Sequence, residues 1–272
     1  METKVIKDIQ DLTYLRWSHV RSSSGTAGTF LKSESTLNNK KLYYKLSNFD
    51  SVNGVIGHES INEIIVDRLL TILGVEHIHY QLINAKIEID GREYNTYLCV
   101  SEDFKELGES KIALDDYYRV NSLKGESHYD FCVRLGFKKY IDQMIAVDYL
   151  ILNRDRHGAN IEVLRNARAK SLRIAPLFDH GLSLLYSCYN DEDINKFDVL
   201  EDKKCRNFIG SNYCYDNLNL INNEYVFNNK LNDNDKDFIF KDLDGILSND
   251  LINKIWELII KRYMKYEKLC NL

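Results

Sequence analysis

The chain has 272 residues, of which 44% are hydrophobic and 28% charged, and this ordinary globular composition argues against an intrinsically disordered protein. Its 36 Lys and Arg against 41 Asp and Glu residues give a net charge of -5, so no general basic field attracts nucleic acid or anionic membranes. The six cysteines form no C-x-x-C pair, the N-terminus lacks a leader pattern, and no window approaches the ~18 apolar residues of a membrane span, which favours a reduced, cytoplasmic protein.

Strand patterns dominate the first part of the chain. Residues 14–33 hold β-prone runs on both sides of a Ser/Gly/Thr cluster, which predicts two strands joined by a glycine-containing loop. Residues 41–47 (KLYYKLS) predict a third strand. Residues 79–104 predict a hairpin that turns at Asp90-Gly91 and continues into a strand over Tyr97 to Val100.

Helical periodicity marks three segments. Residues 58–75 carry Ile and Leu at helical spacing, and Gly74 is placed to end this helix. A second helix is predicted over Phe131 to Leu152. The last helix follows Ser248, a suitable N-cap, and has an apolar face that includes Trp256.

Two short strands, within residues 161–166 and 172–179, are predicted after the second helix, around a turn at Asn166 to Lys170. Strands therefore concentrate early in the chain and helices late. This order predicts an α+β protein of two lobes, with a strand-rich N-lobe over residues 1–104 and a mostly helical C-lobe over residues 105–272.

The loop SSSGTAG, residues 22–28, could fold over phosphates. Gly25 and Gly28 let main-chain N–H groups approach closely, and hydroxyl groups add further donors. The hydroxyl donors belong to Ser22, Ser23, Ser24 and Thr26. A plain Ser/Gly hairpin turn is the alternative for this loop considered alone.

Lys45 lies in the predicted third strand among apolar neighbours, where its ammonium could reach the α- and β-phosphates of a nucleotide. A solvated strand lysine is the alternative. Glu63, on the following helix, could pair with Lys45. Glu59, one turn earlier on the same face, is a second candidate for that role, and either glutamate could instead face solvent.

Two acidic motifs follow in the second part of the chain. In NRDRHGAN, Asp155 and Asn160 have the spacing of the catalytic-loop D-x-x-x-x-N, in which Asp accepts the hydroxyl proton and Asn holds a metal ion. In LFDHGLS, Asp179 precedes a glycine by two places, in the manner of D-F-G. The glycine loop, the strand lysine, the helix glutamate and the two acidic motifs occur in the order that phosphoryl transfer needs. Its catalysis consists largely of positioning the reactants and neutralising the charge of the phosphates. The alternative is that Asp155 caps a turn and Asp179 starts a loop.

Three other charged residues of NRDRHGAN have open roles. His157 could stabilise phosphate charge, shuttle a proton or orient Asp155. Arg154 and Arg156 could bind phosphate or support the loop.

Residues 148–164 (DYLILNRDRHGANIEVL) and 174–185 (IAPLFDHGLSLL) resemble the catalytic and metal motifs of HipA-like serine/threonine kinases, including their small stand-alone CtkA-type group. The wording D-R-H-x-x-N is also similar to that of phosphatidylinositol 3- and 4-kinases. The resemblance covers the chain from about Tyr14 to the C-terminal helix.

This resemblance implies a two-lobed protein-kinase-like fold with ATP and Mg²⁺ in the cleft between the lobes. It makes Asp155 the base and Asn160 and Asp179 the Mg²⁺ ligands. It also makes Lys45 the phosphate-binding lysine and Glu63 its ion-pair partner.

The resemblance further implies that residues 22–28 form the phosphate loop, and that residues 100–104 form the hinge that contacts adenine, with Glu102 near its centre and Phe104 at its end. In HipA-like proteins a serine of the phosphate loop can be autophosphorylated, which ejects the loop and silences the enzyme. The candidates here are Ser22, Ser23 and Ser24.

We therefore expect a serine/threonine protein kinase with a protein substrate and an antitoxin or regulatory partner, without direct nucleic-acid binding. A lipid kinase is an alternative, although no basic amphipathic helix is present to dock on a phosphoinositide surface. A small-molecule kinase and a catalytically weak nucleotide-binding toxin or regulatory module are further alternatives. Residues 188–236, rich in Tyr, Asn and Asp, are predicted to form loops and short helices near the cleft mouth that choose the substrate.

Overall fold

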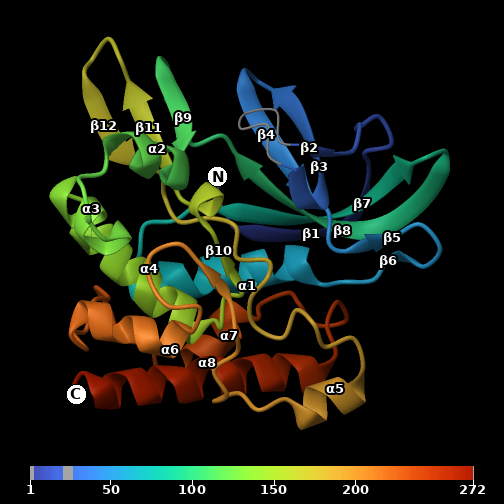
Figure 1. Ribbon diagram of the computed structural model, residues 1–272. Coiled ribbons are helices and arrows are strands. Elements are labelled where there is room, and N and C mark those ends of the chain that lie inside the picture. The colour runs from blue at the N-terminus through green and yellow to red at the C-terminus, as the bar shows by residue number, and fades with distance from the viewer. Residues whose placement is uncertain (1–2, 21–26, 272) are drawn as a thin grey trace.

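The computed structural model describes residues 3–20 and 27–271 (Figure 1). Its largest sheet has six strands in the order β1-β7-β8-β4-β3-β2. The strands are β1 (Lys4–Asp11), β2 (Ser18–Val20), β3 (Ala27–Leu37), β4 (Lys40–Lys45), β7 (Tyr80–Ile89) and β8 (Arg92–Glu102). Only β1 pairs in parallel, with β7. The sequence did not predict β1, because most of its side chains are exposed and show no apolar alternation.

Two tight turns set the register of this sheet. Strands β3 and β4 are joined through Asn38 and Asn39, which have φ of 50° and 61°, and the register pairs Lys32 with Lys45. Strands β7 and β8 are joined through Asp90-Gly91, also at positive φ, as predicted. Two consecutive left-handed residues are typical of the type I′ turn that matches the twist of a hairpin.

Helix α1 (Glu59–Leu73) lies between the sheet and the helices that follow in the chain (Figure 1). It ends where Gly74 adopts φ of 67°, as predicted. Elements pack on both of its sides, so even its polar residues are buried. The buried polar residues of α1 are Glu59, Ser60, Asn62, Glu63, Asp67 and Arg68.

The side chains of β4 alternate between the two faces of the sheet. Leu42 and Tyr44 belong to a core cluster with Leu98 and Val100 on one face. Lys45 points to the opposite face, toward α1 and Glu63. That face joins the larger core cluster, which continues through α1 into the helical part.

The remaining part of the chain is mostly helical. Its helices are α2 (Leu114–Asn121), α3 (His128–Arg134), α4 (Lys138–Leu150), α5 (Asp191–Lys196), α6 (Cys214–Asn217), α7 (Asp235–Ile239) and α8 (Asn249–Leu269), with 3₁₀ turns at Gly158–Asn160 and Leu218–Ile221. A three-stranded sheet contains β9 (Glu109–Ala113), β11 (Glu162–Asn166) and β12 (Ser171–Ile174). The short strands are β5 (Phe49–Asp50), β6 (Gly54–Val55), β10 (Asp155–Arg156) and β13 (Arg206–Asn207).

The predicted helix over Phe131 to Leu152 is in fact two helices, and the prediction was wrong on this point. The chain breaks between α3 and α4, where Gly136 has φ of 84°. That left-handed conformation ends a helix and is open to glycine at little cost. Apolar residues continue across the break, so periodicity alone could not show it.

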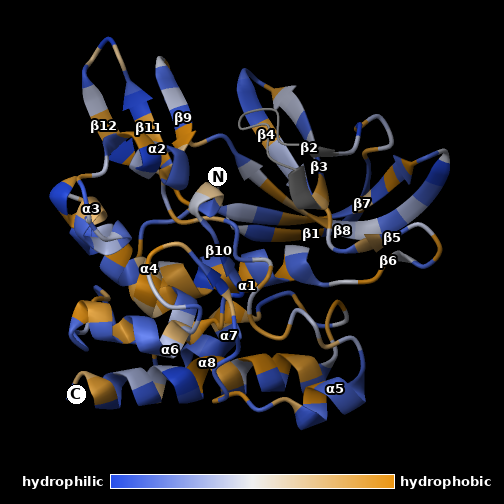
Figure 2. Ribbon diagram, viewed as in Figure 1, coloured by the Kyte–Doolittle hydropathy of each residue, from blue (hydrophilic) through white to orange (hydrophobic). Residues whose placement is uncertain are grey.

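Other predictions for this part are confirmed. The β11–β12 hairpin turns between Asn166 and Ser171, and its outer end is hydrophilic (Figure 2). Ser248 caps α8 by accepting a hydrogen bond from the Leu251 N–H. Helix α8 carries alternating apolar and polar bands and packs on α4 (Figure 2). Within residues 3–20 and 27–271, no helix has the length and apolar character needed to cross a bilayer.

Candidate functional site

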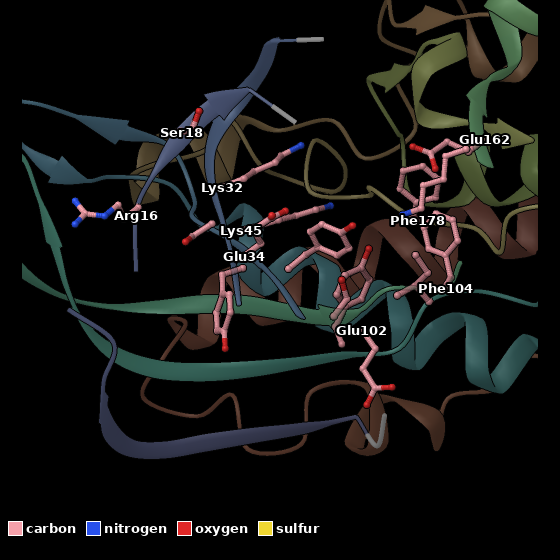
Figure 3. Close-up of a pocket in the computed structure, with 16 residues that line it drawn as sticks. Arg16, Ser18, Lys32, Glu34, Lys45, Glu102, Phe104, Glu162 and Phe178 are labelled. Atoms are coloured by element: carbon pink, nitrogen blue, oxygen red, sulfur yellow. The ribbon is translucent and has the colours of Figure 1, made fainter. Parts of the chain in front are cut away.

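The face of the large sheet that carries Lys45 borders a cavity of about 370 Å³ (Figure 3). This volume lies within the range of about 300–1,000 Å³ that is usual for small-molecule sites. Among the predicted residues, Lys45, Glu102 and Phe104 line it. Among the described residues, the lining consists of Arg16, Ser18, Lys32, Ser33, Glu34, Tyr43, Tyr44, Lys45, Ile78, Tyr80, Ser101, Glu102, Phe104, Lys111, Glu162 and Phe178.

Lys45 connects three distant parts of the chain. Its ammonium lies 2.8 Å from Oε1 of Glu63 on α1 and 2.9 Å from Oδ1 of Asp179. Burial opposes the charge of Lys45, but the carboxylates of Asp179 and Glu63 outweigh it and hold the pKa of Lys45 well above its ordinary value. The lysine therefore presents a fixed positive charge to the cavity.

Glu63, and not Glu59, is the partner of Lys45. The second carboxylate oxygen of Glu63 accepts a hydrogen bond from the main-chain N–H of His180 at 2.9 Å. Glu59 turns instead toward the β4–β5 connection, where its carboxylate accepts from the Asn48 N–H at 3.0 Å. Burial raises the pKa of Glu59, and the Asn48 hydrogen bond opposes this rise.

Asp179 has an unusual backbone conformation, with φ of 62°. Aspartate tolerates this left-handed region better than most residues. The conformation is supported by a hydrogen bond from the Asp179 N–H to the hydroxyl of Tyr80 at 3.3 Å. It turns the carboxylate toward Lys45 and places it 3.9 Å from the ammonium of Lys32.

Asp155 and Asn160 are brought together by the 3₁₀ turn between them. The side-chain amide of Asn160 donates to the main-chain oxygen of Asp155 at 2.8 Å, a bond that does not use the amide oxygen of Asn160. Oδ1 of Asp155 is buried and accepts no hydrogen bond from the described residues. Burial raises the pKa of Asp155, as does the charge of Asp179, whereas His157 and Arg206 oppose the rise. Such a carboxylate is suited to accept a proton.

His157 lies beside Asp155. Its Nδ1 accepts a hydrogen bond from the Ala159 N–H at 3.2 Å, so the proton of the neutral ring is on Nε2. Nε2 lies 3.6 Å from Oδ2 of Asp155, and the ring is partly exposed. His157 is therefore close enough to Asp155 to orient it, which is one of the roles that the sequence left open and which stays a prediction.

Arg154 and Arg156, the two arginines of NRDRHGAN, support the loop, and Arg156 is buried in the core. Its guanidinium binds the Asp148 carboxylate and donates to the main-chain oxygens of Asn160 and Phe178. Arg154 donates to the main-chain oxygen of Lys204 at 2.7 Å. The sequence did not distinguish this supporting role from phosphate binding.

The predicted phosphate loop lies outside the described residues at Ser22, Ser23, Ser24, Gly25 and Thr26. The predicted hinge follows β8. The Glu102 carboxylate turns away from the cavity (Figure 3) and binds Lys40 at 2.9 Å, so Glu102 can contact a base only through its main chain.

Two further lysines that line the cavity, Lys32 and Lys111, were not predicted from the sequence. Lys32 and Lys45 extend in the same direction from paired positions on β3 and β4 (Figure 3). Lys111, on β9, lies 2.7 Å from Asp103 and stacks 4.1 Å from the centre of the Phe104 ring. The Asn38-Asn39 pair was the feature of the sequence that could have pointed to Lys32. A two-residue turn at these asparagines sets the register of β3 and β4, and that register pairs Lys32 with Lys45.

No protein-family model and no curated protein matches this sequence. Solved structures do match it. The Helicobacter pylori proinflammatory kinase CtkA superposes with a TM-score of 0.67 at 15% identity, over 97% of this chain and 97% of that chain. The HipA toxin complex of Shewanella oneidensis MR-1, with HipB and operator DNA, matches at 14% identity over 92% of this chain and 60% of that chain, with a TM-score of 0.42. The likeness to CtkA confirms the predicted two-lobed, protein-kinase-like α+β fold and, at the level of the fold, the resemblance to CtkA-type kinases.

Proposed function

We propose that the protein is a HipA-like kinase that uses ATP and Mg²⁺ to phosphorylate a serine or threonine hydroxyl of a protein. The observation that carries the proposal is the double ion pair of Lys45 with Glu63 and Asp179, at the wall of a nucleotide-sized cavity. A buried lysine held between these two carboxylates is the arrangement that a kinase needs to position phosphates. The similarity of the fold to that of CtkA also supports a kinase function.

The lining of the cavity fits a nucleotide in character. Lys32 and Lys45 supply positive charge on the strands, and Phe104 and Phe178 supply an aromatic wall across the cavity (Figure 3). The two phenylalanine rings are 5.6 Å apart and tilted by 32°. An apolar wall beside a cationic one suits a ligand with a flat base and an anionic tail.

The residues near the cavity also fit a magnesium ion. The carboxylate of Asp179 and the amide oxygen of Asn160 are hard oxygen ligands of the kind that Mg²⁺ prefers. Bound there, the ion would neutralise phosphate charge. We assign these two residues as its protein ligands.

Asp155 would take the proton of the acceptor hydroxyl on Oδ1, which accepts no hydrogen bond from the described residues. Arg206, from the segment 188–236, lies 3.8 Å from that oxygen and is largely exposed. We propose that this segment selects the acceptor, because it brings the exposed cation of Arg206 to the place where the hydroxyl must approach. We further propose that Ser22, Ser23 or Ser24 is phosphorylated by the enzyme itself.

The experiment that tests this proposal is incubation of the protein with Mg²⁺ and γ-labelled ATP, followed by mass spectrometry of the protein for added phosphate. The unmodified protein is compared with Asp155→Asn and Asp179→Asn, and with Asp116→Asn as a control on the exposed face of α2. Nucleotide binding is measured on each variant by calorimetry.

We expect label on the unmodified protein and on Asp116→Asn, within residues 22–26, and none on the other two variants. Asp155→Asn should still bind ATP, whereas Asp179→Asn should lose the Mg²⁺ dependence of binding. Transfer by Asp155→Asn at the normal rate would remove Asp155 as the base. Absence of ATP binding by the unmodified protein would overturn the proposal as a whole.

A further inference from the structure

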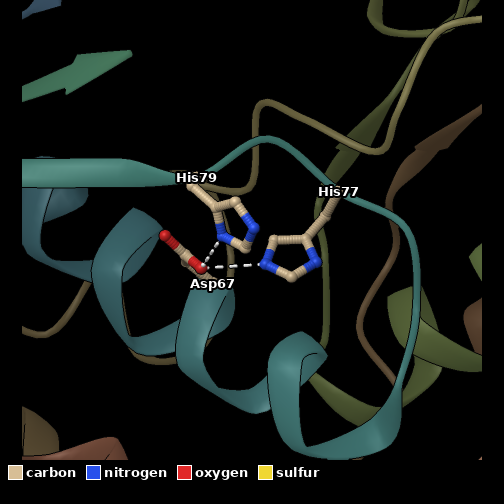
Figure 4. A group of neighbouring side chains, drawn as sticks. All are labelled: Asp67, His77 and His79. Carbon is tan, nitrogen blue, oxygen red and sulfur yellow. Dashed lines mark hydrogen bonds and ion pairs between the residues drawn. The ribbon is translucent and has the colours of Figure 1, made fainter. Parts of the chain in front are cut away.

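Behind the cavity, three ligand-type side chains converge on one point. Asp67 comes from α1, and His77 and His79 come from the segment that leads into β7 (Figure 4). Oδ1 of Asp67 lies 2.8 Å from Nε2 of His77 and 3.0 Å from Nδ1 of His79. One potential ligand atom from each residue lies within 4.8 Å of the other two.

The hydrogen bonds of His77 leave a suitable place for a metal ion at this point, where Nε2 faces Asp67 and also lies 3.4 Å from the Thr71 hydroxyl. Its Nδ1 lies 2.7 Å from the main-chain oxygen of Val75, which can only accept, so Nδ1 carries a hydrogen. In a neutral ring, Nε2 then has a lone pair, and this lone pair faces the carboxylate of Asp67. Two acceptors cannot share a hydrogen bond without a proton or a metal ion between them.

The surroundings of the three side chains are those of a metal site. The other oxygen of Asp67 is occupied by hydrogen bonds from the Tyr80 N–H at 2.7 Å and the Thr3 hydroxyl at 2.8 Å. These contacts leave Oδ1 of Asp67 as its ligand oxygen. In the same way, the hydrogen bond of Nδ1 to the Val75 oxygen leaves Nε2 as the ligand atom of His77. Asp67 and His77 are thus each fixed by an outer hydrogen bond, which is a regular feature of ligands in the metal centres of proteins.

We propose that Asp67, His77 and His79 bind a divalent transition-metal ion, with Zn²⁺ as the favoured ion. Two imidazoles and one carboxylate suit Zn²⁺ and its neighbours, whereas Mg²⁺ and Ca²⁺ prefer oxygen ligands alone. The side chains of Asp67 and His77 are buried, but that of His79 is 45% exposed, so ion and water can enter on its side. A water molecule completes a four-coordinate site.

The two separations from Asp67 to the histidine nitrogens need only a small adjustment. Tetrahedral zinc with bonds of about 2.0–2.1 Å holds its ligand atoms roughly 3.3 Å apart. The observed separations of 2.8 and 3.0 Å are shorter by about half an ångström or less. An outward rotation of the exposed His79 ring would supply most of this change.

The site is joined to the segment that carries Asp179. The residues on either side of His77 bond to Leu177, through Leu177 N–H to the Glu76 oxygen at 3.2 Å and Ile78 N–H to the Leu177 oxygen at 2.9 Å. A metal ion would therefore tie α1 to β7 and brace the segment leading to Asp179. The metal site stands independently of the proposed kinase activity, because its ligands line no part of the cavity.

Metal binding is tested on purified protein stripped with a chelator and dialysed. Zn²⁺ is titrated by calorimetry, and Co²⁺ is titrated with recording of its visible spectrum. The variants are His79→Ala, whose ring is partly exposed, and His128→Ala, a control histidine on α3 that stacks on Phe208. Thermal unfolding with and without Zn²⁺ provides a measurement that needs no variant.

We expect one equivalent of Zn²⁺, a raised Tm that a chelator reverses, and a four-coordinate Co²⁺ spectrum without thiolate charge transfer. His79→Ala should weaken binding by more than the ~10- to 100-fold that loss of an outer-shell partner causes, and His128→Ala should not change it. Cys205 and Cys214, whose sulfur atoms are 3.7 Å apart, form an alternative site that could bind the added Zn²⁺ or Co²⁺ through thiolates. A thiolate signal in the cobalt spectrum, normal binding by His79→Ala, or no stoichiometric binding would each overturn the proposal.

Discussion

Arg156 donates a hydrogen bond to the main-chain oxygen of Phe178 at 3.0 Å, and this contact joins the two acidic motifs. Phe178 precedes Asp179, and Arg156 follows Asp155. The same guanidinium binds the main-chain oxygen of Asn160 at 3.2 Å. One buried cation thus holds both predicted metal ligands and the predicted base in a fixed mutual arrangement.

The first prediction concerns the ion pair that holds this cation. Arg156 and Asp148 are both buried, and the carboxylate of Asp148 accepts hydrogen bonds from two nitrogens of the Arg156 guanidinium. In Arg156→Met the Asp148 carboxylate stays buried without its counter-charge, which should lower the free energy of unfolding by about 3–5 kcal/mol. Urea denaturation measures this loss.

Two further variants make the interpretation of Arg156→Met specific. Arg165→Met removes an exposed arginine from β11 and should change stability by less than about 0.5 kcal/mol. The double variant Arg156→Met with Asp148→Leu should regain part of the loss, because it leaves no buried charge unpaired. The single variant Asp148→Leu completes the cycle, and simple addition of the effects of Arg156→Met and Asp148→Leu would show that the pair is not coupled.

The second prediction separates the two glutamates of α1. Glu63 binds Lys45, and Glu59 binds the Asn48 N–H. In Glu63→Gln the lysine keeps only Asp179 as an ionic partner and shifts from its place, so we expect phosphoryl transfer to fall about 100-fold. In Glu59→Gln the rate should stay near that of the unmodified protein. Initial rates with labelled ATP provide the measurement, and a larger loss in Glu59→Gln would reverse the assignment.

Local signals in the sequence were enough to predict many elements. The Asp90-Gly91 turn, the end of α1 at Gly74 and the Ser248 cap each depend on residues close in the chain. Such features follow from backbone preferences that a single sequence reveals. The spacing of Asp155 and Asn160 is equally local, because one short turn brings them together.

Features that depend on distant contacts could not be predicted from local patterns, and Glu63 was named as the partner of Lys45 only through the family resemblance. Nothing in residues near Glu59 and Glu63 shows which of them meets Lys45, because the choice is made by packing of α1 between the sheet and the helical part. The convergence of His77 and His79 with Asp67 likewise depends on how the segment before β7 returns past α1. Strand β1 was missed because its partner, β7, lies far along the chain.

The third prediction concerns the pH dependence of stability. His58, at the start of α1, is only 8% exposed. Burial lowers the pKa of His58 to about 4, against an ordinary value of 6.5, and a hydrogen bond with the Leu185 main chain opposes this only in part. The unfolded chain therefore takes up a proton near pH 6.5, whereas the folded protein does so only near pH 4.

As the pH falls from 6.5 to 4, His58 should thus remove about 3 kcal/mol from the free energy of unfolding, and it should remove nothing above pH 7. The measurement is urea denaturation of the unmodified protein and of His58→Gln across this range. The difference between the two proteins should narrow or reverse toward pH 4, because only the unmodified protein loses this contribution. A difference that is constant with pH would show that His58 does not titrate in this way.

The fourth prediction concerns the close approach of the Asp155–Asn160 turn to α2. A Cβ atom on Gly158 would lie 2.5 Å from Cβ of Asp115 and 3.1 Å from its main-chain nitrogen. Gly158→Ala should therefore displace the turn, lower the free energy of unfolding by about 1–3 kcal/mol and reduce phosphoryl transfer more than nucleotide binding. The second variant Asp115→Gly removes the two nearest obstructing atoms, Cβ at 2.5 Å and Cγ at 2.8 Å, so Gly158→Ala should cost less in its presence, although glycine itself weakens α2 by about 1 kcal/mol. Unfolding and transfer rates of the four proteins form a double-mutant cycle, and a coupling energy near zero would mean that the turn and α2 do not hold each other in place.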